Sequence, residues 1–147
     1  MKLLAFSDLH RDAAVARTMV DAARQADVVI AAGDFATMGK GLSDTLDVLR
    51  AISVPTILVA GNHDSLDDLR AACANWLHAH VLHGEGASLG GIEFFGMGFE
   101  VSTVDRGPWN SQTSEAEATK ALSPCPAGAI LVTHAPAHGV ADLQANG

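Results

Sequence analysis

The 147-residue chain is poor in cysteine, in cationic residues and in long apolar runs, and each shortage excludes a class of protein. Two cysteines cannot supply the disulfide framework of a small secreted domain. Nine lysines and arginines against 17 acidic residues give a net charge of −8, which argues against an extended nucleic-acid surface. No run approaches the ~20 apolar residues of a transmembrane helix, and the N-terminal run is too short for a secretory signal. We therefore expect a cytoplasmic protein without membrane contact.

The remaining composition is that of a folded domain. Hydrophobic residues make up 48% of the sequence, which excludes general disorder, and 147 residues are enough to bury a core. We expect a single domain over residues 1–147. Cys73 falls on the apolar stripe of a predicted helix, which favours a buried thiol over a redox site.

Short apolar runs that alternate with amphipathic segments predict an α/β fold. The runs expected to form strands lie at residues 2–6, 28–32, 56–60 and 129–133. Because the run at residues 2–6 does not alternate, we expect this strand to be buried on both faces. Helical spacing of apolar residues predicts helices over residues 12–25, from Leu42 to Leu49 and from Leu66 to Leu77. This alternation is typical of parallel strands joined by right-handed crossovers.

The pattern changes after His83. Gly90-Gly91 between two apolar segments is a hairpin signal and predicts the start of a second, antiparallel sheet. The segment 102–114 has no periodicity, and a loop of this length is usually functional or mobile. Ser114 and Glu117 have the spacing of a capping box, which predicts a short helix that ends near Leu122.

Polar residues with metal-ligating side chains follow directly after each of the four predicted strands. They are Asp8 and His10, then Asp34, then Asn62 with His63 and Asp64, and finally His134. Parallel-sheet proteins build their sites at the carboxyl ends of strands, so these side chains are expected to share one cleft. A mixed oxygen and nitrogen set without thiolate favours Mn, Fe, Co or Zn. The two oxygens of Asp34 allow it to bridge two cations about 3.5–4 Å apart.

The order of these motifs resembles that of the calcineurin-like metallophosphoesterases. The matching residues are Asp8-x-His10, Gly33-Asp34, Gly61-Asn62-His63-Asp64 and His134. The resemblance implies a two-sheet α/β/β/α sandwich. It also implies ligand sets for two divalent metal ions: Asp8, His10 and Asp34 for the first, and Asp34, Asn62 and His134 for the second.

The resemblance further implies hydrolysis of a phosphomonoester or phosphodiester by a hydroxide that bridges two metals, with Mn, Fe or Zn as the expected ions. In that interpretation His63 stands beside the scissile phosphate, stabilises the transition state or protonates the leaving oxygen, and is oriented by Asp64. The expected substrate is a small phosphate ester or a nucleotide.

One family feature does not occur in the sequence. The family completes its site with a Gly-His-x-His turn, and no such turn precedes Asn146-Gly147. We therefore expect one missing imidazole for each metal, a C-terminally truncated second sheet and weak phosphoesterase activity. The alternative is a non-catalytic metal-binding or partner-binding remnant of the same fold, whose unpaired sheet edge would favour a homo-oligomer.

Several residues keep two interpretations. An aspartate after a strand, such as Asp8 or Asp34 alone, is often a turn residue. His138 either lines a phosphate pocket or caps its loop, and Trp109 either walls the substrate cleft or anchors the packing of its loop. The cluster His78, His80 and His83 fits a solvated connection better than a metal site. A nucleotide-binding loop at Gly39-x-Gly41 lacks the required pattern.

Overall fold

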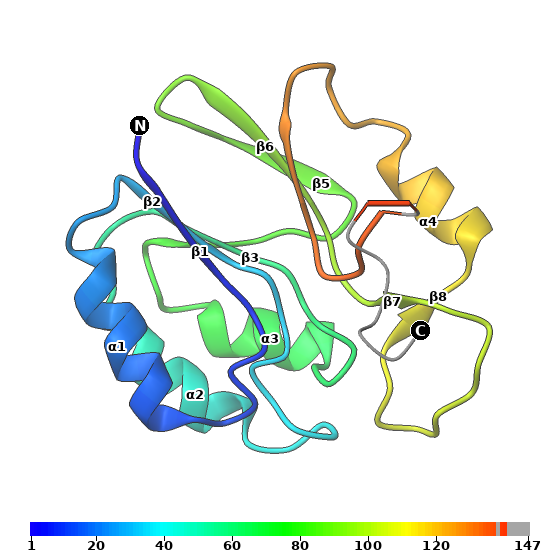
Figure 1. Ribbon diagram of the computed structural model, residues 1–147, viewed down its shortest axis with the longest axis horizontal. Coiled ribbons are helices and arrows are strands. Elements are labelled where there is room, and N and C mark those ends of the chain that lie inside the picture. Colours follow the sequence, from blue (N-terminus) through cyan, green and yellow to red (C-terminus); the bar gives the residue numbers. More distant parts are fainter. Residues whose placement is uncertain (138, 141–147) are drawn as a thin grey trace.

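The computed structural model describes residues 1–137, 139 and 140. Four parallel strands form the main sheet in the order β1-β2-β3-β4. They are β1 (Leu3–Phe6), β2 (Val28–Ala31), β3 (Thr56–Leu58) and β4 (Ala79–Val81). The connecting helices α1 (Ala13–Ala23), α2 (Leu42–Leu49) and α3 (Leu66–Cys73) lie together on one face of this sheet (Figure 1).

A second sheet packs against the opposite face. Its order is β5-β6-β9, with β5 (Glu85–Leu89), β6 (Ile92–Met97) and β9 (Ile130–Thr133). The predicted hairpin at Gly90-Gly91 is confirmed: β5 and β6 are antiparallel, and both glycines have a positive φ that other residues rarely adopt. Because β9 pairs with β6 in parallel, however, the sheet is mixed and not purely antiparallel as expected.

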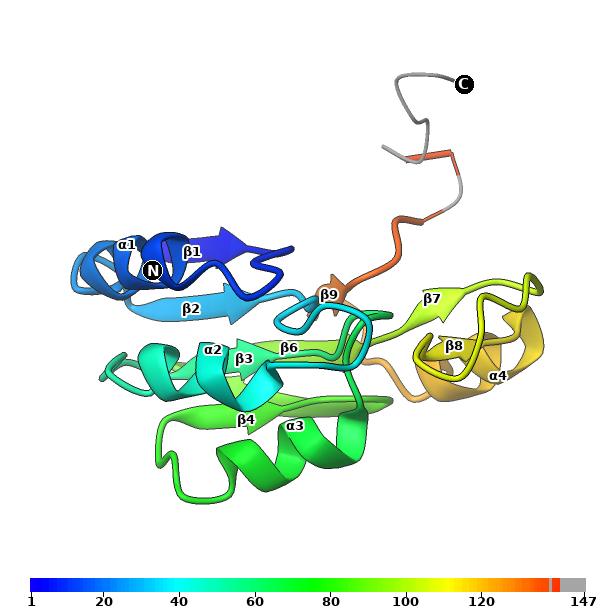
Figure 2. The same ribbon diagram turned by 90° about the horizontal axis from the view of Figure 1, so that it is seen from below.

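Between β6 and β9 the chain forms a small unit at one end of the sandwich. It consists of the parallel pair β7 (Glu100–Val101) and β8 (Gln112–Thr113), followed by α4 (Glu115–Leu122). The main-sheet strands point toward the side on which this unit lies (Figure 2). The fold is therefore α/β with two facing sheets, and the carboxyl ends of the main strands face the β7–β8 unit.

Alternate residues of β2 and β3 enter two separate apolar cores. Val29 and Leu58 lie in the core under the three helices, whereas Ile30 and Ile57 lie in the core between the two sheets. This period of two follows from the pleat of a strand. Both strands are therefore buried on both faces, the arrangement expected of residues 2–6.

Strand β1 departs from that expectation. Leu4 and Phe6 pack against the helix-side core, but Leu3 is 39% exposed on the other face. The reason is position: β1 is the edge strand of the main sheet, and the core between the sheets is built on β2 and β3. An unbroken apolar run therefore does not by itself show that both faces are covered.

Serine side chains cap the starts of two helices, and the capping box predicted at Ser114 and Glu117 is confirmed. The Ser65 side chain accepts a hydrogen bond from the Asp68 backbone N–H at the start of α3. Ser114 and Glu117 form the reciprocal capping box of α4. Cys73 is buried, as its place on the apolar stripe predicts, and burial raises the pKa of its thiol to about 11.

The segment that holds three histidines differs from its prediction as a connection. Residues Ala79–Val81 form β4, so His80 lies in an edge strand. The His83 Nδ1 accepts a hydrogen bond from the Gly98 N–H at 3.3 Å. Burial and the charge of Arg70 lower the pKa of His83, against the opposing charge of Glu85. The metal-ligand group found among the described residues lies elsewhere, at His10, Asp34 and His63. None of the helices in the described part of the chain is long and apolar enough to cross a membrane.

Candidate metal centre

The loop after β1 presents Asp8 and His10 in left-handed conformations, with φ values of 57° and 44°. Such values are uncommon for residues other than glycine and cost free energy, so the surroundings must hold them. Three main-chain hydrogen bonds to the loop after β2 do so. The N–H groups of Asp8, His10 and Arg11 donate to the carbonyls of Gly33, Asp34 and Phe35 at 3.0, 2.9 and 3.1 Å.

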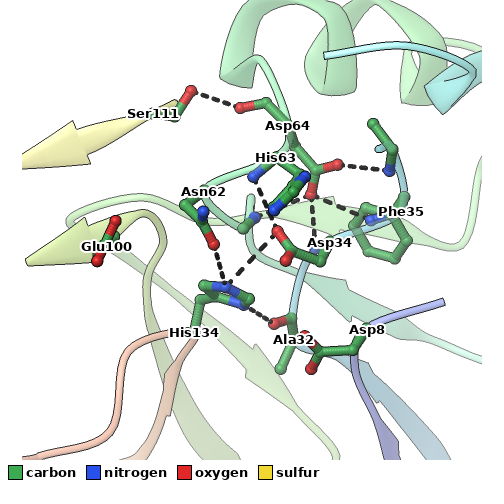
Figure 3. Close-up of polar contacts among 12 residues, drawn as sticks. Asp8, Ala32, Asp34, Phe35, Asn62, His63, Asp64, Glu100, Ser111 and His134 are labelled. Carbon is green, nitrogen blue, oxygen red and sulfur yellow. Dashed lines mark hydrogen bonds and ion pairs between the residues drawn. The ribbon is translucent and has the colours of Figure 1, made fainter. Parts of the chain in front are cut away.

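Asp34 occupies the centre of the site. It is 3% exposed and also left-handed, with a φ of 58°. Its Oδ2 lies 3.5 Å from the His10 Nε2, and its Oδ1 lies 3.6 Å from the His134 Nε2. The same Oδ1 accepts the backbone N–H of His63 at 2.9 Å. The Asp34 carboxylate therefore faces the imidazoles of His10 and His134, which come from opposite ends of the chain. Figure 3 shows the His134 side of this arrangement.

Both of these histidines are held in the same way. The His10 Nδ1 lies 3.1 Å from the Ala36 carbonyl oxygen, and the His134 Nδ1 lies 2.7 Å from the Ala32 carbonyl oxygen. A carbonyl only accepts hydrogen bonds, so in each neutral ring Nδ1 carries the proton and Nε2 keeps its lone pair. An Nδ1–H fixed on a main-chain carbonyl is the usual arrangement of a histidine that ligates a metal through Nε2.

The donor atoms around Asp34 form two sets that share this residue. The first contains the His10 Nε2 with the Asp8 Oδ1 at 3.7 Å, and the second contains the His134 Nε2 with the Asn62 Oδ1 at 3.2 Å. In each set the lone pairs of the two atoms point toward each other, and a cation between them would be coordinated by both atoms. Ligands about 2.0–2.2 Å from a metal lie roughly 3.0–3.5 Å apart, close to these separations. The residues present therefore fit divalent cations.

His63 lies next to the ligand atoms but has the opposite hydrogen-bonding state. Its candidate ligand atom lies within 4.8 Å of those of His10 and Asp34. The His63 Nδ1, however, accepts the Met38 backbone N–H at 2.8 Å. In the neutral ring the proton is therefore on Nε2, which makes His63 a hydrogen-bond donor toward the centre and not a lone-pair ligand. Its ring also packs 4.7 Å from the ring of Trp109.

The expected pairing of Asp64 with His63 is wrong. Asp64 is 1% exposed, and its carboxylate accepts the backbone N–H groups of Asp34 (2.8 Å), Phe35 (3.3 Å), Ala36 (2.8 Å) and Gly61 (2.9 Å). Among the described residues no hydrogen bond joins it to the His63 side chain. Burial raises the pKa of Asp64, with a further rise from the charge of Asp34, while the N–H groups of Ala36, Gly61 and Phe35 oppose the shift by stabilising the anion. The carboxylate turns inward because four buried amides need an acceptor there.

A further side of the site is formed by the C-terminal end of the loop that joins β7 to β8, residues 102–111. The Ser111 N–H donates to the Asn62 carbonyl at 2.8 Å, and its hydroxyl donates to the Asp64 carbonyl at 2.6 Å. The Asn62 side-chain amide donates to the Asn110 Oδ1 at 2.8 Å. These contacts dock the segment on the loop after β3.

The structure brings all five proposed ligands together at the carboxyl edge of the main sheet. Their assignment as metal ligands stays a prediction, as does a catalytic role for His63. His138 lies outside the described residues. Two contributors were missed: the Met38 N–H, because a main-chain group has no sequence signal, and Asn110, because it lies in a segment without periodicity.

These features define an α/β protein whose main sheet gathers candidate metal ligands at one edge. The calcineurin-like phosphoesterase superfamily domain matches residues 1–145, and the chain belongs to that superfamily, as the sequence resemblance implied. No curated protein sequence matches the chain.

Two solved structures share the fold. The crystal structure of TT1561 from Thermus thermophilus is 18% identical with a TM-score of 0.72, over 83% of this chain and 60% of the other. A second structure is 17% identical with a TM-score of 0.67, over 90% of this chain and 67% of the other. The chain thus spans about three fifths to two thirds of the length of these structures.

Proposed function

We propose that this chain provides a dinuclear metal site for the hydrolysis of a phosphomonoester or phosphodiester. The observation that supports it best is the place of Asp34, whose two oxygens face two imidazole Nε2 atoms at 3.5 and 3.6 Å. Both imidazoles have their other nitrogen fixed on a main-chain carbonyl. A shared carboxylate between two such donor sets is the arrangement that two-metal hydrolases use.

The residues divide into two ligand sets. Asp8, His10 and Asp34 would hold one divalent cation, and Asp34, Asn62 and His134 would hold the other. The mixture of carboxylate, amide and imidazole suits Mn, Fe or Zn. When bound, such cations supply Lewis acidity toward phosphoryl oxygens and acidify a water molecule at neutral pH.

His63 has the position and the proton for a contact with the substrate. The Met38 N–H holds its Nδ1, and Nε2–H is then available to a phosphoryl oxygen or to the leaving oxygen. The half-buried ring of Trp109 beside it offers a flat wall for the group attached to the phosphate. This neighbour is compatible with a small phosphate ester or a nucleotide as substrate.

The first experiment measures metal binding and hydrolysis on the same samples. Calorimetric titration with Mn²⁺ should reveal two bound ions, and a chromogenic phosphodiester should be cleaved in excess Mn²⁺. His134→Ala should lose one ion, because it removes the Nε2 ligand. His63→Ala should keep both ions and lose turnover, because His63 is assigned to the substrate.

The outcomes separate the two function classes. Loss of metal in His63→Ala would contradict its assignment to the substrate, and failure of the unmodified chain to bind Mn²⁺ would overturn the proposed site. Two ions without turnover would favour the non-catalytic alternative. An exposed carboxylate on α2 gives the matched control, since Asp44→Asn should change neither metal binding nor turnover.

A further inference from the structure

The orientation of the Asn62 side-chain amide decides whether it can be a metal ligand. Only its carbonyl oxygen can coordinate a cation, and the NH₂ group in its place would repel one. In the structure the Asn62 Oδ1 faces the His134 Nε2 at 3.2 Å, and the Asn62 Nδ2 points away and donates to the Asn110 Oδ1 at 2.8 Å. A rotation of this amide by half a turn would place its two hydrogens toward the cation.

The orientation of the Asn110 side-chain amide is fixed by two residues other than Asn62. Its Nδ2 donates to the Glu100 Oε2 at 3.2 Å and to the Gln112 Oε1 at 2.9 Å. If the Asn110 amide were reversed, its carbonyl oxygen would face a carboxylate that can only accept hydrogen bonds. The Asn110 oxygen is therefore directed toward Asn62, and only the NH₂ of Asn62 can meet it.

Glu100 is itself held in place by the small β7–β8 sheet and by a cation. The register of this sheet sets Glu100 opposite Gln112, and the second carboxylate oxygen, Oε1, contacts the Arg106 guanidinium at 3.2 Å. Figure 3 shows Glu100 on its strand at the outer side of Asn62, away from Asp34. The Glu100 carboxylate, which can only accept hydrogen bonds, thus fixes the orientation of the Asn110 amide. The Asn110 amide in turn fixes the orientation of the Asn62 amide at the candidate metal centre.

We propose that Asn110 is a positioning residue that, with Glu100 behind it, keeps the Asn62 carbonyl oxygen turned toward the metal. This inference rests on the proposed metal site. Asn110 reaches no ligand atom of the cation itself, and its effect is transmitted only through the Asn62 amide. Contacts of this kind typically change metal affinity by about 10–100-fold when they are removed.

The main test compares Asn110→Leu, Asn62→Ala and the double variant by calorimetry with Mn²⁺ alone. Asn110→Leu keeps the branched shape of the side chain but removes both hydrogen-bonding functions. We expect it to weaken binding at the site that contains Asn62 by about 10-fold or more. The double variant should bind no more weakly than Asn62→Ala, because Asn110 has nothing to orient once the amide is gone.

A reversal of the hydrogen-bond direction tests the mechanism. Asn110→Asp places a carboxylate against Glu100 and should weaken Mn²⁺ binding. Adding Glu100→Gln supplies an NH₂ that can donate to the new carboxylate, whose other oxygen then accepts from Asn62. The combined variant should return to within about threefold of the wild-type affinity, a rescue that a general loss of packing would not produce. Thr103→Ala, at an exposed position of the same segment, is the control and should have little effect.

A readout without metal completes the test. The Asn62 NH₂ protons should exchange slowly with solvent in the metal-free wild type and faster in Asn110→Leu, as followed by side-chain amide NMR. Unchanged Mn²⁺ affinity in Asn110→Leu, or additive losses in the double variant, would overturn the positioning role while Asn62→Ala still weakens binding. No loss in Asn62→Ala would instead overturn the proposed metal site itself.

Discussion

The inner side of the candidate metal centre, residues 8–11, 32–36 and 61–64, is joined mainly through main-chain atoms. Its three loops share hydrogen bonds between backbone groups and one buried carboxylate, that of Asp64. The outer side, residues 98–114 with His134, has main-chain bonds from Phe99 and Ser111 but relies largely on side chains. These side-chain contacts are the Asn62–Asn110 amide pair, the Ser111 hydroxyl and the His134 imidazole. The two sides meet at Asp34.

This difference shows which substitutions each side tolerates. Main-chain hydrogen bonds survive most changes of side chain, so the inner side depends on the backbone path and on Asp64. On the outer side the side-chain contacts each depend on the identity of one residue, and most of these residues are half-buried or exposed. Loss of the Asp64 carboxylate on the inner side should therefore destabilise the domain, whereas loss of an outer side-chain contact should mainly change the geometry of the site.

The largest effect is expected for Asp64→Ala. It leaves four buried N–H groups without their acceptor, which should lower the free energy of unfolding by about 3–5 kcal/mol. Urea denaturation measures it. Asp67→Ala, at an exposed position three residues along the chain, is the control and should stay within about 0.5–1 kcal/mol of wild type. A loss below about 1 kcal/mol for Asp64→Ala would remove the proposed distinction between the two sides.

The next effect concerns metal affinity. Asp34→Asn should weaken Mn²⁺ binding more than Asn62→Ala, because Asp34 belongs to both ligand sets and carries their shared charge. Asparagine also tolerates the left-handed φ of 58°, so the backbone of this variant should be preserved. We expect at least a ~100-fold loss for Asp34→Asn and about 10-fold for Asn62→Ala by calorimetry. The opposite order would show that Asp34 is not shared.

The reactivity of the two cysteine thiols extends the comparison to the helix layer, which holds Cys73, and to the region between α4 and β9, which holds Cys125. Cys73 is buried under the main sheet with a pKa raised to about 11, so at pH 8 roughly one thiol in 1,000 is ionised. Cys125, between α4 and β9, is only half-buried. Mass spectrometry after brief maleimide treatment of the native protein should find the label on Cys125 and very little on Cys73. Equal labelling would mean that the helix layer opens as readily as the outer one.

The smallest expected effect lies at the start of α4. The backbone N–H and hydroxyl of Ser114 donate to the Glu117 carboxylate and lower its pKa, with a further contribution from Thr113. Because these hydrogen bonds lower the pKa of Glu117 in the folded state, they stabilise α4 fully at pH values above the ordinary pKa of glutamate. This stabilisation is lost as the pH falls through the pKa that Glu117 has in the folded state. An NMR titration of Glu117 should show a midpoint below 4.5 that rises in Ser114→Ala. An unchanged midpoint would exclude the Ser114 hydroxyl as a cause of the lowered pKa.

Much of the inner side could be predicted from the sequence. Asp8, Asp34 and Asn62 each follow an apolar run, and the carboxyl ends of parallel strands lie on the same edge, so their convergence follows from topology. The direction in which Asp64 turns could not be predicted in this way. Its neighbour in sequence is His63, but the unsatisfied amides that attract it belong to residues 34–36, about 30 positions earlier.

The outer side was predicted less well, for a physical reason. Strands β7 and β8 have two residues each, too few to show alternation. Asn110 has no pattern around it, and its contribution depends on partners brought near by β7–β8 pairing. Contacts that depend on individual side chains leave little periodic trace in a sequence.

The His134–Ala32 hydrogen bond also bears on the order in which the molecule folds. It joins residues 102 positions apart, so the second ligand set can form only after β9 has paired with β6. Closing so long a loop costs chain entropy, and this cost is offset only when its contacts form. A divalent ion that needs His134 therefore binds the completed fold and not its partly assembled precursors. By mass action the ion draws the folding equilibrium toward the native chain, and the midpoint of thermal unfolding should rise with metal concentration.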